Sequence, residues 1–360
     1  MRINKKILSL CLLTASCSVS AAQVNVYNWF GYIPDDSLQV FRDTSKTELS
    51  YDVYESNEIL ETKLLSGGSR YDLVVPSANF MERQVKTGIY QKIDRSKIPN
   101  YNKIDPVILK KVEAYDPGNQ YSVPYAWGSI GVGYNVKMIK ERLGEIPENT
   151  FDMVFDPEVS AKLKDCGIAL IDSPAEAMSM ALHYLGLDPN SEDKGDLKKA
   201  EEMLRAVRGN YKYFHNGSYR DDLANGDICV ALGYNGIILA GNAIAKSIDP
   251  DREIAYSIPN IGSLIWFDVM AIPADAPNPG GAHEFINFIL EPEIGSSISN
   301  MVKYAVPNLG ANEYVEPEIF NDPGIYPSDA VKETLFALQA HSQKYDRILN
   351  RAWTNIKTNR

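Results

Sequence analysis

Short apolar strands alternate with helical patterns along the chain, and this alternation constrains the fold more than any other feature of the sequence. Residues 24–27, 49–54 and 72–75 have the pattern of strands. Helices beginning near Pro34 and after Ser56 separate them, because proline suits the first helical position and serine is a favoured helix cap. Such alternation builds largely parallel sheets covered by helices. The sequence therefore predicts an α/β fold with ligands at the carboxyl ends of strands.

The same periodicity continues through the second half of the chain and predicts further elements. These are strands at 167–171, 228–233 and 265–272, and helices at 175–185, 197–207, 237–245 and 282–290. Two closing helices are predicted at 328–339 and 345–356, with no strand between them.

The glycine-rich segment 128–135 suggests a dinucleotide-binding loop only superficially, since the third glycine and the later acidic residue of that fingerprint are missing. A strand that crosses between two lobes explains its glycines better, and a second crossing is expected near 257–259. Two lobes also suit a chain whose 338 residues after the leader exceed what one core usually supports. The predicted N-terminal lobe comprises residues 23–131 and 259–306, and the C-terminal lobe comprises residues 132–258 and 307–360.

Residues 1–22 have the features of a secretory signal peptide. Basic residues at Arg2, Lys5 and Lys6 precede an apolar stretch at 7–15, and small residues follow it. The pattern allows cleavage after Ala21 or after Ala22. Because no later segment has the uninterrupted apolar length of a membrane helix, we expect the mature chain to be soluble outside the cytoplasm.

Charge and cysteine content narrow the possibilities further. Removing the leader changes the formal charge from −11 to −14, with 33 basic against 47 acidic residues, which disfavours nucleic acid and anionic lipid as partners. Only Cys166 and Cys229 remain in the mature chain. An even pair in an exported protein, without Cys-x-x-Cys or paired-histidine spacing, favours a disulfide over a metal site. We therefore predict a Cys166–Cys229 bridge within one lobe.

Seven motifs follow one another along the chain: Tyr27-Asn28-Trp29-x-x-Tyr32, Tyr54-Glu55-Ser56-Asn57-Glu58, Asp72-Leu73-Val74-Val75-Pro76-Ser77, Gly131-Val132-Gly133-Tyr134-Asn135, Asn225-Gly226-Asp227-Ile228-Cys229-Val230, Trp266-Phe267-Asp268 and Arg351-Ala352-Trp353-Thr354. Together and in this order they resemble those of the periplasmic polyamine-binding proteins of ABC importers, most of all the putrescine-binding branch. The resemblance implies a two-lobed periplasmic binding protein of type II that closes over its ligand at a strand hinge. It also implies that Cys166 and Cys229 form the disulfide of that branch.

The resemblance further implies a ligand site built from carboxylates, hydroxyls and aromatic faces. Such a site suits a polyamine, because carboxylates accept its ammonium groups and each cation–π contact contributes about 0.5–2 kcal/mol. The residues carried over are Trp29, Tyr32, Ser77, Glu176, Tyr234, Trp266, Asp268 and Tyr304. Considered without the resemblance, Tyr234, Tyr304 and Phe267 would be assigned to the core. Asp268 would still need a cationic partner, since an unpaired carboxylate in an apolar strand is costly.

Three departures from the family pattern bear on specificity. The resemblance implies acidic residues at the positions of Gly31 and Ile237 in putrescine binders, and at that of Ser173 in spermidine binders. Glu176 and Asp268 are then the carboxylates that remain. We hypothesise a longer polyamine of the spermidine or norspermidine kind, with putrescine as the alternative ligand.

Other functions remain open at this point. A periplasmic sensor that reports polyamine to a membrane receptor would need the same lobes as a transport protein that delivers ligand to an inner-membrane permease. An enzyme is disfavoured, because the four histidines have no metal-ligand spacing and no nucleophile turn or phosphate loop is present. An amino acid with a terminal amine would need a basic anchor that the carried-over set lacks. We expect no cofactor and no metal, and a monomer.

Overall fold

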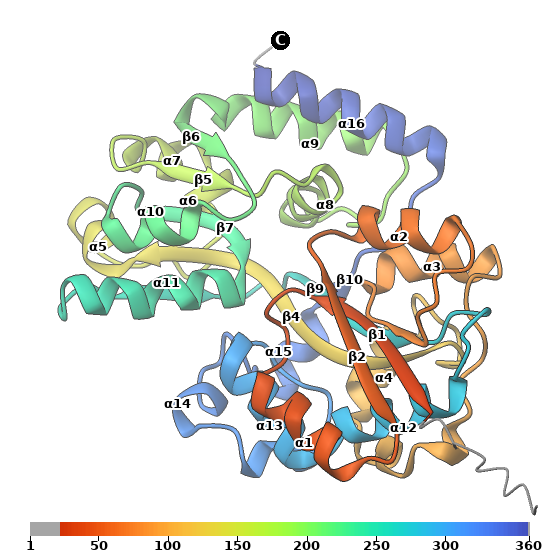
Figure 1. The fold of residues 1–360 in the computed structure, drawn as a ribbon. Coiled ribbons are helices and arrows are strands. Elements are labelled where there is room, and N and C mark those ends of the chain that lie inside the picture. The colour runs from red at the N-terminus through yellow and green to blue at the C-terminus, as the bar shows by residue number, and fades with distance from the viewer. Residues whose placement is uncertain (1–21, 359–360) are drawn as a thin grey trace, which may run out of the picture.

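The computed structural model describes residues 22–358, which form an α/β structure around a ten-stranded mixed sheet (Figure 1). The strand order is β2-β1-β3-β9-β4-β7-β5-β6, with β10 paired to β9 and β8 paired to β4. Residues 1–21 of the predicted leader lie outside the described residues. Among residues 22–358, no helix combines the length and the apolar character needed to cross a bilayer.

Strands and covering helices alternate in the N-terminal lobe, as predicted. Its first three strands pair in parallel, and its last strand runs antiparallel to the third. In chain order its elements are β1 (Gln23–Trp29), α1 (Asp35–Thr44), β2 (Glu48–Tyr54), α2 (Asn57–Leu65), β3 (Leu73–Val74), α3 (Ala78–Lys86), the 3-10 turns Arg95–Lys97 and Pro99–Lys103, α4 (Pro106–Val112), β9 (Leu264–Ala271), α12 (Pro279–Ile289) and α13 (Pro292–Val302). Ser56 caps α2 as predicted, accepting a hydrogen bond from the Ile59 N–H.

The C-terminal lobe repeats the arrangement around a second core. Its elements are α5 (Val136–Leu143), α6 (Asp152–Phe155), α7 (Pro157–Lys162), β5 (Ile168–Leu170), α8 (Pro174–Tyr184), α9 (Lys194–Val207), the 3-10 turn Arg208–Asn210, β6 (Tyr211–Phe214), α10 (Tyr219–Asn225), β7 (Val230–Tyr234), α11 (Asn235–Ile248), β8 (Ile254–Ser257) and α16 (Gln343–Thr358). Figure 1 shows α16 lying along α9 at the top of this lobe.

Strand β4 (Ser122–Asn135) joins the two lobes and confirms the predicted strand hinge. Its first half pairs with β9 in the N-terminal lobe, and its second half pairs with β7 and β8 in the C-terminal lobe. The glycines of 128–135 therefore belong to a buried crossing strand and not to a nucleotide loop. The chain returns to the N-terminal lobe between β8 and β9, which agrees with the second predicted crossing.

The closing part of the chain differs from the sequence prediction. The helix expected over 328–339 ends early: α15 spans Asp329–Thr334, and β10 (Phe336–Ala337) follows it. Phe336 pairs with Leu264 of β9, so an extended conformation gains ladder hydrogen bonds that a continued helix would forgo.

The exact lobe boundaries remain a prediction. The packing of the residues after 306 is relevant to the boundary predicted there. The 3-10 turn Leu309–Glu313, α14 (Pro317–Phe320) and α15 follow that boundary. Val315, Ile319 and Leu335 pack in a cluster with Leu60 and other N-terminal-lobe residues, and Figure 1 draws α13 and α14 in the lower half of the molecule. We propose that the N-terminal lobe continues to residue 335 and that the chain crosses a third time before α16.

The predicted disulfide is confirmed. Cys166 and Cys229 are bonded with their Cα atoms 5.4 Å apart, and both are buried in the core of the C-terminal lobe. The bridge joins the segments that enter β5 and β7, two strands that pair in parallel. It therefore fixes the start of two strands whose carboxyl ends face the N-terminal lobe.

Candidate ligand-binding site

A cleft of about 1110 Å³ lies between the lobes, where the carboxyl ends of several strands meet. The end of β1, the loop after β3 and the middle of β9 line it from the N-terminal lobe. The starts of α8 and α11 line it from the C-terminal lobe. All eight residues nominated from the sequence line this one cleft: Trp29, Tyr32, Ser77, Glu176, Tyr234, Trp266, Asp268 and Tyr304.

Asp268 is the buried acceptor of the N-terminal lobe. Its carboxylate accepts hydrogen bonds from the Tyr32 hydroxyl at 2.6 Å and from Ser77 Oγ at 2.7 Å, and the residue is 6% exposed. Burial raises the pKa of Asp268 from 3.8 to about 6, although the two hydroxyls act in the opposite direction. Trp266 also lines the cleft. Phe267 between them borders the cleft too, but it is 1% exposed and packs in the core, as strand alternation predicts for its side chain.

The N-terminal lobe holds these partners in place through a short network. Asn57 donates to Ser77 Oγ at 3.0 Å and accepts from the Ser77 N–H at 3.0 Å, which orients the serine toward Asp268. The Trp29 indole N–H donates to the Val75 carbonyl at 2.9 Å, which fixes the ring against the end of β3. Contacts within the N-terminal lobe therefore hold the wall around Asp268.

Glu176 is the acceptor of the C-terminal lobe. It lies in the first turn of α8, and its Oε2 accepts a hydrogen bond from the Tyr234 hydroxyl at 2.7 Å. Desolvation raises the pKa of Glu176, while hydrogen bonds from Tyr234 and Ser173 lower it. Tyr234 itself ends β7 and caps α11. The cleft thus has one carboxylate with a tyrosine partner on each lobe.

Aromatic rings connect the two acceptors. The Trp266 and Tyr304 rings meet edge to face with centroids 4.6 Å apart, and Trp266 meets Tyr234 at 6.4 Å. Tyr304 in turn meets Tyr32 at 6.2 Å. Edge-to-face contacts of this kind are favourable, and aromatic faces can attract a cation.

Two of the three positions that depart from the family pattern, Ile237 and Ser173, line this cleft, and Gly31 lies between the lining residues Phe30 and Tyr32. Gly31 adopts φ +65°, a left-handed conformation that glycine accommodates readily, and no atom lies within 4 Å of the place a Cβ would occupy. Phe30 beside it is 76% exposed and lines the cleft mouth. Ile237 and Ser173 line the opposite lobe. The cleft therefore presents apolar or small groups at these points.

Several lining residues were missed by the sequence reasoning. Asn57 stands in one of the recognised motifs just after β2, where a strand end in a parallel sheet could have indicated it. Residues 338–341 follow β10 without regular secondary structure and also line the cleft, which the helical pattern over 328–339 concealed. Asp172, at the end of β5, also lines the cleft.

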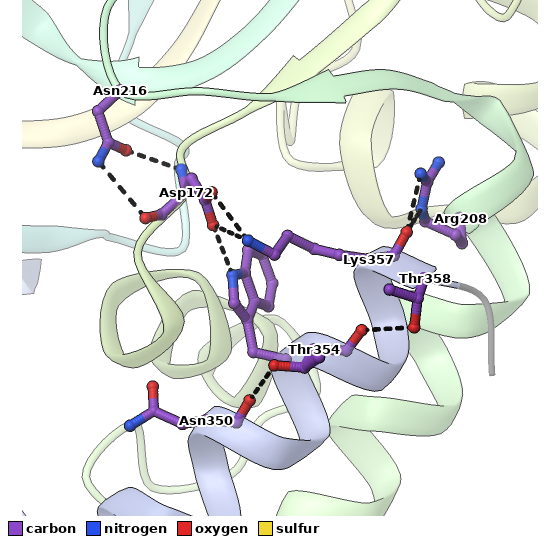
Figure 2. Close-up of polar contacts among 8 residues, drawn as sticks. Asp172, Arg208, Asn216, Asn350, Thr354, Lys357 and Thr358 are labelled. Atoms are coloured by element: carbon purple, nitrogen blue, oxygen red, sulfur yellow. Dashed lines mark hydrogen bonds and ion pairs between the residues drawn. The ribbon is translucent and has the colours of Figure 1, made fainter.

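The Asp172 carboxylate is paired with a lysine of the C-terminal helix α16 (Figure 2). The Lys357 ammonium lies 2.8 and 2.9 Å from its two carboxylate oxygens, and the Trp353 indole N–H donates to it at 2.8 Å. Burial raises the pKa of Asp172, but these donors outweigh that effect and hold the pKa below its usual value. Arg208 donates to the Lys357 carbonyl, so α16 is anchored to the lobe at this corner.

The cleft offers little that would bind an anion or a metal ion. Arg83 lines the cleft, but its guanidinium pairs with Glu61 at 3.0 Å and lies over the Phe80 ring. In the part of the chain that the structure describes, no group of three or more histidine, cysteine or acidic side chains could hold a metal ion. The cleft therefore presents acceptors and aromatic faces, which suit an organic cation.

The fold and the cleft together define a two-lobed binding protein in which crossing strands join the lobes and the candidate site lies between them. The family model described as bacterial extracellular solute-binding protein matches residues 41–327. The chain belongs to this family.

Relatives and solved structures agree with that membership. The chain is 42% identical to the putrescine-binding periplasmic protein SpuD of Pseudomonas aeruginosa and 41% identical to the putrescine-binding periplasmic protein PotF of Escherichia coli, each over 99% of both chains. A crystal structure of the spermidine/putrescine ABC transporter substrate-binding protein PotD from Streptococcus pneumoniae superposes with a TM-score of 0.83 at 27% identity. That match covers 94% of this chain and 99% of the other.

Proposed function

We propose that this protein is a periplasmic solute-binding protein that captures a polyamine in the inter-lobe cleft and delivers it to an inner-membrane ABC permease. One observation carries the proposal: Asp268 and Glu176, each bonded to a tyrosine hydroxyl, stand on opposite lobes of one aromatic cleft. A ligand with two ammonium groups would join the lobes. The relatives include putrescine-binding and spermidine/putrescine-binding periplasmic proteins, which supports this ligand class.

A role in binding and transport is supported by two relatives that are putrescine-binding periplasmic proteins and by the similar structure of an ABC transporter substrate-binding protein. The sensor alternative would use the same cleft, but neither the relatives nor residues 22–358 supply an observation that favours it. All eight cleft residues nominated from the sequence are proposed ligand contacts.

We further propose that a triamine of the spermidine or norspermidine kind binds more tightly than putrescine. The family resemblance implies carboxylates at the positions of Gly31 and Ile237 in putrescine binders, and these two residues supply none. Two acceptors for the ammonium groups of a short diamine are therefore missing. Isothermal titration calorimetry with putrescine, cadaverine, spermidine and norspermidine tests the order. We expect at least one triamine to bind with a Kd of about micromolar or below, which corresponds to roughly 8 kcal/mol. Putrescine binding tighter than every triamine would contradict the proposed preference without contradicting polyamine binding.

Affinity should depend on pH through Asp268. A protonated amine pairs with the ionised carboxylate, but the carboxyl of the unliganded protein has a pKa of about 6. Below that pH the ligand must displace a proton, so affinity should be about tenfold weaker at about pH 5 than at about pH 7.5. Calorimetry in buffers of different ionisation enthalpy would also detect proton release near pH 6.

The control for this pH dependence is the Asp268→Asn variant, whose residual binding should change much less over the same range. Glu176 contributes in the same direction, because desolvation raises its pKa as well. Equal affinity of the wild-type protein at the two pH values would exclude Asp268 as the ammonium acceptor.

A further inference from the structure

The first turn of α11 touches the N-terminal lobe at Tyr304, one of the residues that line the cleft. Gly236 lies beneath the Tyr304 ring so closely that a Cβ built on it would stand 2.7 Å from Tyr304 Cζ, with another ring carbon closer still. The adjacent Asn235 side chain donates to the Gly324 carbonyl at 2.9 Å. Tyr304 follows α13 in the N-terminal lobe, and Gly324 lies in the segment that packs with that lobe. The contact between Gly236 and Tyr304 therefore crosses from one lobe to the other.

The Tyr304 ring has little freedom to avoid such a contact. It meets Trp266 on one side at 4.6 Å and Tyr32 on another at 6.2 Å, and Tyr32 donates to Asp268. Packed interiors leave few gaps, so moving this ring would displace its neighbours or separate the lobes. Either movement would change the distance between the Asp268 side and the Glu176 side of the cleft.

Glycine is a poor choice for this position on helix propensity alone. Gly236 lies inside α11, outside the positive-φ region, where alanine would stabilise a helix better than glycine does. No backbone conformation at this position requires glycine, so the feature that explains it is the close approach of the Tyr304 ring.

We propose that Gly236 is a positioning residue for lobe closure: the absence of its side chain lets Tyr304 rest on the α11 backbone when the two lobes meet around a ligand. This inference rests on the proposed polyamine-binding function. It predicts that adding one methyl group at this position acts as a wedge between the lobes. Such a wedge lowers the population of the closed state. The apparent affinity for ligand falls by the same factor as that population.

The test is Gly236→Ala, with two readouts that should move in opposite directions. The melting temperature of the unliganded variant should equal or exceed that of the wild type, because alanine favours the helix. Affinity for the tightest polyamine, measured by calorimetry, should be about tenfold weaker or more. Stopped-flow fluorescence should place most of the loss in a faster koff, because the wedge acts on the closed complex.

The matched control is Gly280→Ala in α12. This glycine is also helical and is exposed, and its added Cβ would meet only Asn278 Oδ1 at an ordinary 3.5 Å. Gly280→Ala should gain the same helix propensity while leaving polyamine affinity and koff at wild-type values.

A second pair of variants keeps the inference testable if Gly236→Ala folds poorly. With the ring removed by Tyr304→Ala, the additional Gly236→Ala change should cost no further affinity, so the double-mutant cycle should be strongly non-additive. A folded Gly236→Ala protein with wild-type affinity and koff would overturn the inference, as would additive losses in the cycle. Wild-type protein that binds no polyamine would instead overturn the proposed function on which the inference rests.

Discussion

Asp268→Asn should weaken polyamine binding by about a hundredfold or more, which corresponds to about 3 kcal/mol. The carboxylate is buried, and its two hydroxyl partners are neutral donors, so a bound ammonium would be its charge partner. Asparagine keeps the size and one acceptor oxygen but removes the charge, and a desolvated charge pair is worth more than a neutral hydrogen bond. Isothermal titration calorimetry at neutral pH measures the loss.

Stability provides the control for this variant, since a loss of affinity through misfolding would lower the melting temperature. Burial raises the folded-state pKa of Asp268 to about 6, above its ordinary value of 3.8. The folded protein therefore holds this proton more tightly than the unfolded chain, and the associated stability is lost as pH rises through about 6. Asparagine removes that cost, so the unliganded variant should melt no lower than wild type at neutral pH.

Substitution of an exposed carboxylate distinguishes a direct ion pair with Asp268 from the general attraction of a cation to an acidic protein. Asp251→Asn removes an exposed carboxylate that does not line the cleft. It should leave affinity unchanged within error, because exposed charges are screened by salt. If Asp251→Asn and Asp268→Asn weakened binding equally, Asp268 would not be a specific acceptor of the ammonium group. The affinity would then reflect the general attraction of cations to an acidic protein.

The elements of the fold follow from local sequence signals wherever the signal and the tertiary contacts agree. Ser56 is a good helix cap both by type and in the structure, and Trp266 and Asp268 share a strand face because side chains alternate. At Phe336 the two disagree. The helical pattern there loses to pairing with Leu264, a residue 72 positions earlier that no local window includes.

The site is harder to predict than the fold because its contacts join distant parts of the chain. Tyr32 and Asp268 are separated by 236 residues, and Asp172 and Lys357 by 185. An isolated carboxylate in an apolar strand indicated that Asp268 needed a partner, but residue chemistry alone would have assigned Tyr234 and Tyr304 to the core. The family resemblance supplied those two residues, and the structure places both at the cleft.

The largest effect on stability should come from breaking the Cys166–Cys229 bridge. The cysteines are 63 residues apart, and the segment between them includes β5, α8, α9, β6 and α10. Closing a loop of this length restricts the unfolded chain, so removal of the bridge should lower the free energy of unfolding by about 4 kcal/mol. Chemical denaturation of the Cys166→Ser/Cys229→Ser double variant, followed by circular dichroism, measures this loss.

The same variant distinguishes a stabilising role of the bridge from a direct role in the site. In the native state, hydrogen bonds between β5 and β7 keep both strand ends in register, so Glu176 and Tyr234 should still meet at low temperature. Polyamine affinity well below the melting temperature should therefore be retained, whereas binding should fail at a lower temperature than in the wild type. A reducing agent should shift the wild type toward the double variant and leave the double variant unchanged. Unchanged denaturation midpoints would mean that strand pairing alone restrains the C-terminal lobe, and that the bridge contributes nothing to holding Glu176 opposite Asp268.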